Sequence, residues 1–173
     1  MPKNTINIRL ATTDDAQSIR QVQHDAWIAT YPNKEQGITL EAIRQRVSKY
    51  LTAEYIQKLK VLMADPKHCS WVAMDRFGIV GYSTAMRHAE ANHLQAIYVL
   101  PAYHGLDVGG QLIQSALAWL GNEKNIHVEV ASYNGRAIRF YEKHGFRKNG
   151  EEGFNQNIPT IELVRKVLAK NHT

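Results

Sequence analysis

The sequence predicts an α/β (α+β) fold with about seven strands and about four helices. Patterns typical of strands and of helices alternate along nearly the whole chain, and a strand, a turn and a helix follow one another twice, over residues 94–110 and 129–146. A chain of 173 residues, 44% of them hydrophobic, has the size of one compact unit and can bury a substantial core. We therefore expect a single domain over residues 1–173.

The first part of the chain predicts one strand followed by helices. The strand covers residues 6–11, and Thr12 or Thr13 opens a helix. The apolar stripe of this helix is Ala16, Ile19, Val22, Ala26 and Ala29. Between about Leu40 and Ala64 apolar residues again recur every three or four positions, which favours one long helix or two short ones. These residues are Ile43, Val47, Leu51, Tyr55, Leu59 and Leu62.

The rest of the chain alternates strands and helices. In order, we expect strands near 69–75 and 79–90 joined by a turn at 75–78, a strand at 93–100, a helix at 108–121, a strand at 126–132, a helix at 135–144 and two closing strands. The inward residues of the helix at 108–121 are Leu112, Ile113, Ala116, Leu117 and Leu120.

The turn before residue 108 is rich in glycine, with Gly105, Gly109 and Gly110. Such a turn at the start of a helix directs several unpaired backbone N–H groups and the positive end of the helix dipole at one point, which suits a phosphate. The first inference is a phosphorylated ligand. The alternative is that these glycines serve only a tight connection between strand and helix.

The second strand, turn and helix carries a further pattern. Asn134 stands at a helix N-cap, and Ala137 and Tyr141 fall one turn apart on the same helix face. Gly145 sits where a left-handed C-cap is needed before Phe146 returns to the core. The two segments together read as the two walls of a slot for a cofactor.

This pairing resembles the GNAT superfamily of N-acetyltransferases. The later motif of that family reads Asn-x-x-Ala-x-x-Phe-Tyr-x-x-x-Gly-Phe, and the chain matches it at Asn134, Ala137, Phe140, Tyr141, Gly145 and Phe146. The acetyl-CoA motif reads Gln/Arg-x-x-Gly-x-Gly/Ala. Here His104 stands in place of Gln or Arg and Asp107 in place of the first glycine, so that only Gly109 remains of the three.

These two departures concern the phosphate site. A carboxylate at Asp107 repels a pyrophosphate, although Asp tolerates the left-handed backbone that a glycine would supply, and its side chain can point to solvent. His104 can still donate a hydrogen bond to a phosphate. Its alternative role is that of a solvated loop histidine.

The resemblance implies the GNAT fold, with a central, mixed, mostly antiparallel and twisted sheet that is splayed between its fourth and fifth strands. Acetyl-CoA lies in that splay as the co-substrate and extends the sheet as an added strand would. The expected order of elements agrees with this fold over nearly the whole chain. Carried over residue by residue, the resemblance implies that the cofactor contacts Ile97, Tyr98, Val99, His104, Gly105, Leu106, Asp107, Val108, Gly109, Gly110, Asn134, Ala137 and Tyr141.

The chemistry of acetyl transfer calls for a base and an acid. A primary amine such as lysine has a reference pKa of about 10.4, so it must lose a proton before it attacks a thioester. Tyr141 matches the family tyrosine that approaches the thioester sulfur, and we expect it to act as the general acid. The alternative is a core aromatic at helical spacing. A strand N–H group, that of Val99 or a neighbour, would polarise the carbonyl oxygen.

For the base, the resemblance favours Glu129, because the branch that acetylates protein α-amines has a glutamate at this place. The match is loose, since Ala131 and Tyr133 replace the Arg and the Ser of that branch. The alternative is a glutamate on an exposed strand face with no role in catalysis. His93 and Glu90, near the start of the strand at 93–100, are rival bases.

The acceptor pocket is predicted near Trp27 and Tyr31. Their Trp-x-x-x-Tyr arrangement is similar to that of many small-molecule and polyamine acetyltransferases of the superfamily, and such aromatics can close over an amine. Trp27 can equally seal its helix against the sheet. Glu151 and Glu152 offer carboxylates to a cationic acceptor, or belong to a solvated hairpin loop.

The function that follows is an acetyl-CoA-dependent N-acetyltransferase, which transfers the acetyl group directly in a ternary complex without a metal, a redox cofactor or a covalent enzyme intermediate. The acceptor is a primary amine of a small molecule, a polyamine or a peptide α-amine. The alternative is a non-catalytic acyl-CoA-binding or sensor protein that keeps the fold.

Composition bears on the remaining partners. The net charge of +5 is mild and the Lys and Arg residues are scattered, which gives little support to nucleic-acid binding. The chain has no apolar run long enough to span a bilayer, and residues 1–4 show no signal-peptide pattern. Its one cysteine, Cys69, excludes an internal disulfide, and we expect it to be a buried strand residue. We expect a cytoplasmic protein, and a homodimer stays open.

Overall fold

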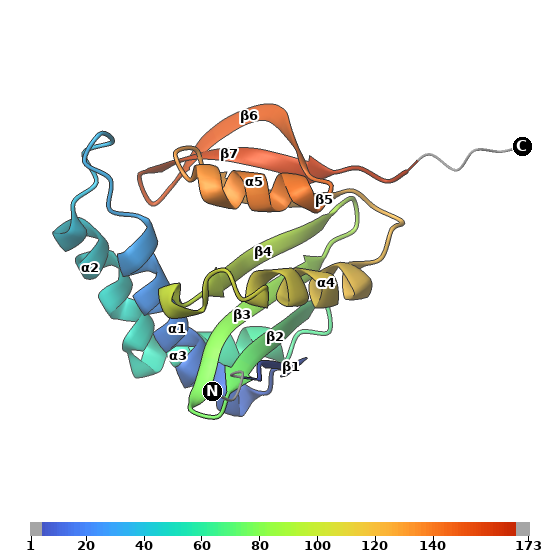
Figure 1. Cartoon of the computed structure of the whole chain (residues 1–173). Helices are drawn as coiled ribbons and strands as arrows, with labels where there is room; N and C mark the ends of the chain where they lie inside the picture. Colours follow the sequence, from blue (N-terminus) through green and yellow to red (C-terminus); the bar gives the residue numbers. More distant parts are fainter. Residues whose placement is uncertain (1–4, 169–173) are drawn as a thin grey trace, which may run out of the picture.

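Seven strands form one sheet in the computed structural model, which describes residues 5–168, so that residues 1–4 and their expected lack of a signal peptide lie outside it. The sheet order is β1-β2-β3-β4-β5-β7-β6 (Figure 1). The strands are β1 Asn7–Leu10, β2 His68–Asp75, β3 Gly78–Arg87, β4 Asn92–Val99, β5 Ile126–Ala131, β6 Arg147–Asn155 and β7 Ile158–Arg165. The β4–β5 pair is parallel and the other pairs are antiparallel, which confirms the predicted mixed sheet.

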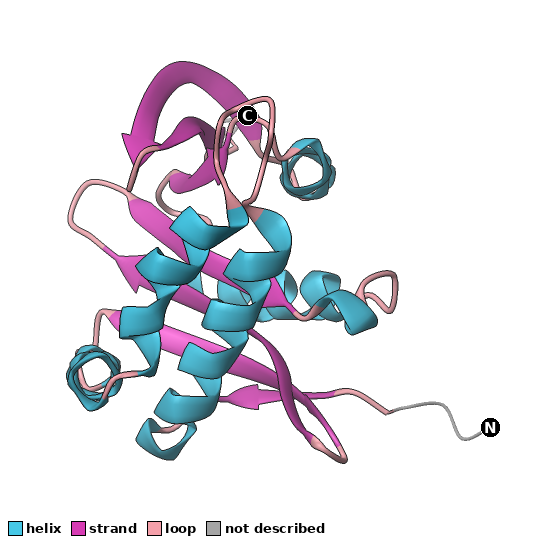
Figure 2. Ribbon diagram, turned by 90° about the vertical axis from the view of Figure 1, so that its left-hand side faces the viewer, coloured by secondary structure: helices cyan, strands magenta, loops and turns pink. Residues whose placement is uncertain are grey.

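Helices cover both faces of the sheet. They are α1 Ala16–Thr30, α2 Leu40–Ser48, α3 Ala53–Met63, α4 Val108–Leu120 and α5 Gly135–Lys143. One core packs α4 and α5 against strands β2 to β5 and β7, and a second core packs α1 and α3 against β2 and β3. Figure 2 looks from the side of α1 to α3 and shows helices lying across the strands.

The segment between α1 and β2 contains two short helices rather than one long helix. The Thr39 side chain caps α2, and Thr52 caps α3 by accepting a hydrogen bond from the Tyr55 N–H. A single 3-10 turn at Lys49–Leu51 separates them. The described residues therefore contain five α-helices, which agrees with the second of the two alternatives for residues 40–64, and Leu51 is 40% exposed because it lies in the break.

Besides Leu51, two positions differ from the predicted burial. Ala29 was assigned to the apolar stripe of α1, but it is exposed, whereas Trp27 is only 5% exposed. The last turn of α1 therefore presents a different side to the core, because Trp27 packs against the aromatic rings of Tyr31 and Tyr50. Cys69 lies in β2 as expected and is half-buried rather than fully buried.

Strands β4 and β5 are paired at two positions and then separate. The pairs are Asn92 with Ile126 and His93 with His127, both at the start of the strands. The register of β4 against β3 shifts at Gln95, as in a β-bulge, and this kind of irregularity bends a strand. In Figure 1, β5, β7 and α5 diverge from β4 toward the ends of the parallel strands. The predicted splay is confirmed.

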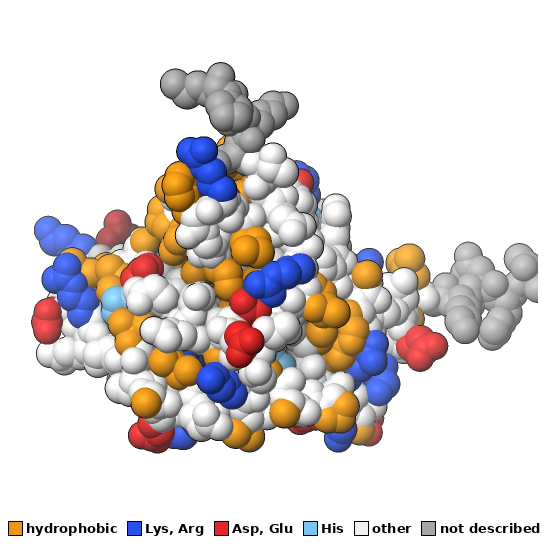
Figure 3. All heavy atoms as spheres, turned by 90° about the horizontal axis from the view of Figure 1, so that it is seen from below, with side chains coloured by type: hydrophobic (Ala, Val, Ile, Leu, Met, Phe, Trp, Pro, Cys, Tyr) orange, Lys and Arg blue, Asp and Glu red, His pale blue; other side chains and the backbone are white. Residues whose placement is uncertain are grey.

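Charged side chains of both signs lie at the surface. On the face that Figure 3 shows, Lys and Arg side chains are scattered among acidic ones rather than gathered in one patch. In residues 5–168, no helix combines the length and the apolar character that a membrane span requires.

Candidate active site

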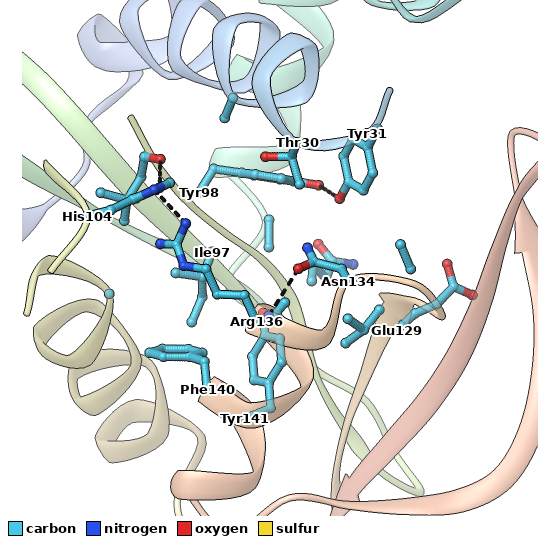
Figure 4. A pocket seen from close by; sticks show the side chains of 18 residues that line it. Thr30, Tyr31, Ile97, Tyr98, His104, Glu129, Asn134, Arg136, Phe140 and Tyr141 are labelled. Carbon is cyan, nitrogen blue, oxygen red and sulfur yellow. Dashed lines mark hydrogen bonds between the residues drawn. The ribbon is translucent and has the colours of Figure 1, made fainter. Parts of the chain in front are cut away.

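A cavity of about 190 Å³ lies where β4 and β5 separate (Figure 4). Its walls come from the end of α1, from β4, from the start of α4, from β5 and from α5. The residues that the sequence predicted for the site and that line this cavity are Tyr31, Ile97, Tyr98, Val99, His104, Gly109, Glu129, Asn134, Ala137 and Tyr141. The splay thus brings the two sequence motifs to one cavity.

Tyr141 reaches the cavity from α5. Its ring is 7% exposed and packs edge-on against the rings of Phe140 and Phe146. Burial raises the pKa of the Tyr141 hydroxyl well above its ordinary value, and the nearby Tyr31 adds to the shift. The hydroxyl is therefore protonated at neutral pH and can donate a hydrogen bond or a proton.

Glu129 lies at the end of the cavity that is farthest from His104 in Figure 4. Its carboxylate is on an exposed part of β5 and accepts a hydrogen bond of 3.0 Å from the Asn155 side-chain amide. The two rival bases, His93 and Glu90, do not line the cavity. Of the three candidates, Glu129 is thus the one that faces the predicted reaction site.

His93 belongs to a separate group of side chains at the closed end of the β4–β5 pair. Its ring stacks on that of His127 with ring centroids 5.4 Å apart, and Nδ1 of His127 lies 3.0 Å from a carboxylate oxygen of Glu162 in β7. Burial and the neighbouring His88 and His127 lower the pKa of His93. This group lies beyond the lining of the cavity.

Tyr31 and Tyr98 form a pair of phenols at the α1 side of the cavity. Their hydroxyl oxygens are 2.9 Å apart, and the Tyr133 hydroxyl donates to the Tyr31 carbonyl at 2.8 Å. Burial raises the pKa of Tyr31 to about 12 and raises that of Tyr98 as well. Both phenols therefore stay protonated and offer their oxygens to a donor such as an ammonium group.

Trp27 does not reach the cavity. It packs behind Tyr31, with ring centroids 4.5 Å apart at an interplanar angle of 61°, and belongs to the core beneath α1 and α2. The prediction that Trp27 contacts the acceptor is therefore replaced by its alternative, in which Trp27 seals the helix. Tyr31 is the member of the Trp-x-x-x-Tyr pair that lines the site.

His104 is held by protein groups through both of its ring nitrogens. Nε2 lies 2.9 Å from the Val99 carbonyl oxygen, and Nδ1 lies 2.5 Å from an Arg136 guanidinium nitrogen. Burial lowers the pKa of His104, and the Arg136 charge acts in the same direction. The expected hydrogen bond from His104 to a phosphate is therefore not available in this arrangement.

The first turn of α4 keeps free backbone donors. Asp107 stands at the N-cap with φ of 58°, which is the left-handed conformation that Asp tolerates, but its side chain makes no capping hydrogen bond. Its carboxylate lies against Gly110, where a Cβ atom would be 2.1 Å from Oδ1, so a larger residue at position 110 would require the Asp107 carboxylate to move. The uncapped N–H groups of this turn fit a phosphate of acetyl-CoA.

The residues from 104 to 110 that were predicted to contact the cofactor differ in whether they line the cavity. Gly105, Leu106, Asp107, Val108 and Gly110 do not line the cavity, because they form the outside of the turn or the buried side of α4. Gly109 does, and a Cβ there would be 3.3 Å from the Phe140 ring, so glycine allows α4 and α5 to approach closely.

Several lining residues were missed by the sequence reasoning. They are Ala26, Thr30, Gln95, Ala96, Val130, Ala131, Arg136 and Phe140. Phe140 is a named position of the second motif and could have been included for that reason. Arg136 lies two residues after the Asn134 cap, a place from which a side chain on the first turn of α5 can face the same ligand as the cap.

A family model described as "Acetyltransferase (GNAT) domain" matches residues 66–148. An uncharacterized N-acetyltransferase of Mycobacterium tuberculosis is 34% identical over 112 residues, which are 59% of this chain and 72% of the relative. The chain belongs to the GNAT superfamily of N-acetyltransferases. It is accordingly an enzyme that uses acetyl-CoA as the acetyl donor, which disfavours the non-catalytic alternative.

Other relatives of this GNAT chain differ in the acceptor that their names state. The spermine/spermidine N(1)-acetyltransferase of Bacillus subtilis is 28% identical, over 58% of this chain and 76% of the relative. The peptidyl-lysine N-acetyltransferase YjaB of Escherichia coli is 30% identical, over 75% of this chain and 90% of the relative. The names of these relatives therefore do not decide between a polyamine and a peptide lysine as the acceptor.

The fold of a solved structure agrees with this assignment. The PaiA N-acetyltransferase of Thermoplasma acidophilum, in complex with coenzyme A, aligns with a TM-score of 0.78 and 20% identity. The alignment covers 94% of this chain and 99% of that one. The GNAT fold thus extends well beyond the segment that carries the two motifs.

Proposed function

We propose that this GNAT enzyme acetylates a primary amine by direct transfer in a ternary complex, with Tyr141 as the general acid and Glu129 as the general base. One observation carries the proposal: a buried, protonated phenol and a carboxylate line the same cavity, where β4 and β5 separate. Acetyl-CoA supplies the activated acetyl group. Glu129 takes a proton from the acceptor ammonium, directly or through water, and Tyr141 protonates the departing thiolate.

The acceptor side of the cavity suits a cation. The phenol oxygens of Tyr31 and Tyr98 form its wall, and Glu129 provides a negative charge at its end. A main-chain N–H group of β4 that polarises the thioester carbonyl stays a prediction. The reacting amine would thus be bound between phenol oxygens and a carboxylate, in a chain whose overall charge is positive.

Among amines, a polyamine fits best. Glu162 of β7 lies directly opposite Glu129 in the β5–β7 register, so that the two carboxylates project from the same face of the sheet. Opposite residues of like charge destabilise a strand pair. His127 and Asn149 already contact the Glu162 carboxylate, and a second ammonium group of the acceptor would add a further positive charge beside the two carboxylates. The Bacillus subtilis relative supports this choice by its name. A peptide lysine, supported by the Escherichia coli relative, is the second candidate.

The test is acceptor-dependent release of free CoA, followed with a thiol reagent. Acetyl-CoA is mixed with spermidine, spermine, lysine-containing peptides, peptides with a free α-amine and aminoglycosides. We expect the polyamines to give the highest kcat/KM and Tyr141→Phe to lower kcat about 100-fold or more, the range typical of general-acid catalysis. The matched control is Tyr103→Phe, which removes a hydroxyl bonded to Asp75 outside the cavity and should leave kcat unchanged.

Two results would contradict the proposal. Undiminished turnover in Tyr141→Phe would remove the tyrosine from the chemistry. Preference for a peptide over every polyamine would replace the polyamine by the second candidate and leave the catalytic residues in place. Tyr141→Phe keeps the aromatic packing against Phe140 and Phe146, so a loss of activity with an unchanged melting temperature would not come from unfolding.

A further inference from the structure

Arg136 links the two walls of the cofactor slot. It lies in the first turn of α5, on the β5 side, and its guanidinium reaches His104, which follows β4 on the opposite wall. Figure 4 shows the Arg136 side chain extended across the cavity toward His104. Arg136 is an exposed residue that also lines the cavity, so its cation lies at the open side of the slot.

The hydrogen bonds determine where the proton of the His104 ring lies and how many donors of Arg136 stay available. A guanidinium has only donors, so His104 Nδ1 must accept from Arg136. The hydrogen of the neutral imidazole is then on Nε2, which donates to the Val99 carbonyl. Both ring nitrogens of His104 are therefore occupied. Arg136 has five N–H donors and uses one of them in the hydrogen bond to the imidazole.

The position of Arg136 has no evident structural benefit. A cation near a helix N-terminus is opposed by the helix dipole. The Asn134 side chain already caps α5 by accepting from the Ala137 N–H. Within residues 5–168, Arg136 takes part in none of the ion pairs. Its charge and its remaining donors are thus unmatched inside the protein and face a cavity.

The opposite wall explains why a cation is needed there. Asp107 occupies the place of the first motif glycine and adds a carboxylate beside the free N–H groups of α4. That charge weakens the attraction of the helix terminus for a phosphate. The family residue at position 104, Gln or Arg, is replaced by a histidine whose nitrogens are both occupied.

We propose that Arg136, oriented by His104, binds the pyrophosphate of acetyl-CoA and takes over the task of the missing Gln or Arg of the motif. The phosphate-binding side chain of this enzyme then comes from α5 and not from the turn before α4. The inference rests on the use of acetyl-CoA in the proposed active site, and it makes His104 a positioning residue rather than a ligand.

The experiment measures the Kd of acetyl-CoA and of 3′-dephospho-acetyl-CoA by calorimetry, for the wild type and for Arg136→Ala. Both probes carry the pyrophosphate. We expect Arg136→Ala to raise both Kd values about tenfold or more, as befits the loss of a charge-assisted bidentate contact. The control is Arg139→Ala, which removes an exposed cation from the same helix outside the cavity and should leave both Kd values unchanged.

A second pair of variants separates binding from structure. His104→Ala should raise both Kd values less than Arg136→Ala does, because it only releases the guanidinium. The double variant Arg136→Ala, His104→Arg should recover at least part of the affinity, because it returns a guanidinium to the family position. Arg136→Gln replaces Arg136→Ala if the latter melts at a lower temperature than the wild type.

The outcomes are distinct. Unchanged affinity in Arg136→Ala, or a loss confined to acetyl-CoA, would overturn the assignment to the pyrophosphate, and the second result would assign the 3′-phosphate instead. Failure of His104→Arg to recover affinity in the double variant would also count against it. Because Kd is measured without an acceptor, these results hold even if no amine in the panel is acetylated.

Discussion

In the proposed mechanism Glu129 accepts a proton and Tyr141 donates one. Of these two residues, Glu129 is the easier to replace without a change of structure. Glu129→Gln keeps the side-chain length and an oxygen that can accept from Asn155, so we expect little change in stability. Without a base, kcat/KM for the amine should fall about 100-fold or more, and the rise of rate with pH that reports the base should disappear. Initial rates between pH 5.5 and 9 measure both effects.

The residue opposite Glu129 in the sheet is the control for this prediction. Glu162→Gln removes a carboxylate from the same face but outside the cavity lining. We expect this variant to raise the KM for spermidine with little effect on kcat. The reason is that the native Glu162 carboxylate would bind a remote ammonium group and not the reacting one. If both variants lowered kcat equally, the assignment of the base to Glu129 alone would be wrong.

His68 gives a prediction on stability rather than on activity. It is 6% exposed, and within the described residues neither of its ring nitrogens has a hydrogen-bond partner. Burial lowers the pKa of His68, so the folded state favours the neutral ring. The unfolded state therefore binds more protons in acid, and the free energy of unfolding should fall as the pH drops below about 6.5.

Melting temperatures at pH 7.5 and pH 5.5 test this point. We expect the wild type to lose more stability between these values than His68→Leu does, since leucine fills the site and does not titrate. His93 and His104 also have lowered pKa values, so a smaller pH dependence of the same sign should remain in the variant. An equal fall in both proteins would mean that His68 is not protonated on unfolding.

At the scale of elements, the start of α4 combines stabilisation of the helix with a cost to ligand binding. The Asp107 carboxylate interacts favourably with the helix dipole, a contribution of about 0.3–1 kcal/mol, and it repels a phosphate by a comparable amount. Asp107→Asn keeps a residue that tolerates the left-handed backbone. We expect it to lower the Kd of acetyl-CoA about twofold to fivefold and to lower the melting temperature slightly.

Asp14→Asn is the matched control for that exchange. Asp14 is an exposed acidic residue in the first turn of the 3-10 helix that precedes α1, away from the cavity. It can change the melting temperature, but it should not change the Kd measured by calorimetry. A weaker affinity in Asp107→Asn would show that the carboxylate supports the turn that binds the phosphate, and our reading of the repulsion would fail.

The positions of the helices and strands could largely be predicted, because each depends on the residue types and apolar spacing of its own segment. The strand-turn-helix segments, the Asn134 cap and the left-handed Gly145 follow from residue types that suit one conformation. The break between α2 and α3 was left open, because the apolar spacing runs through Leu51 and only the Thr52 cap marks the new helix. Trp27 and Ala29 were misjudged, since neighbouring helices and not periodicity decide which side of the last turn of α1 is buried.

At the scale of the whole molecule, the residues of the site come from elements far apart in the sequence. Motifs located Tyr141 and Asn134 because their spacing is local. The contact of Arg136 with His104 spans 32 positions and crosses an open cavity, so no periodicity or spacing could reveal it. The same holds for the Tyr31–Tyr98 pair, whose members were predicted for different subsites.

The splay gives the last prediction, because it leaves two parts of the sheet weakly joined. Strands β1 to β4 lie on one side and β5, β7 and β6 on the other, and the two pairs at Asn92 and His93 are the ladder between them. A ligand that lies along β4 as an added strand would bridge both parts. At 100 times its Kd, acetyl-CoA should stabilise the fold by about 2.7 kcal/mol, which raises the melting temperature by about 5–10 °C.

Hydrogen exchange can then locate this stabilisation. Amides of β4 beyond His93 and of the first turns of α4 and α5 should exchange more slowly with acetyl-CoA, because they bind it directly or lie beside it. Amides of β1 and β2, which are paired on the far side of β3 and do not line the cavity, serve as the internal reference. Protection spread evenly over all strands would indicate global stabilisation alone, whereas protection confined to α4 would place the ligand on one wall and contradict the bridging role of the splay.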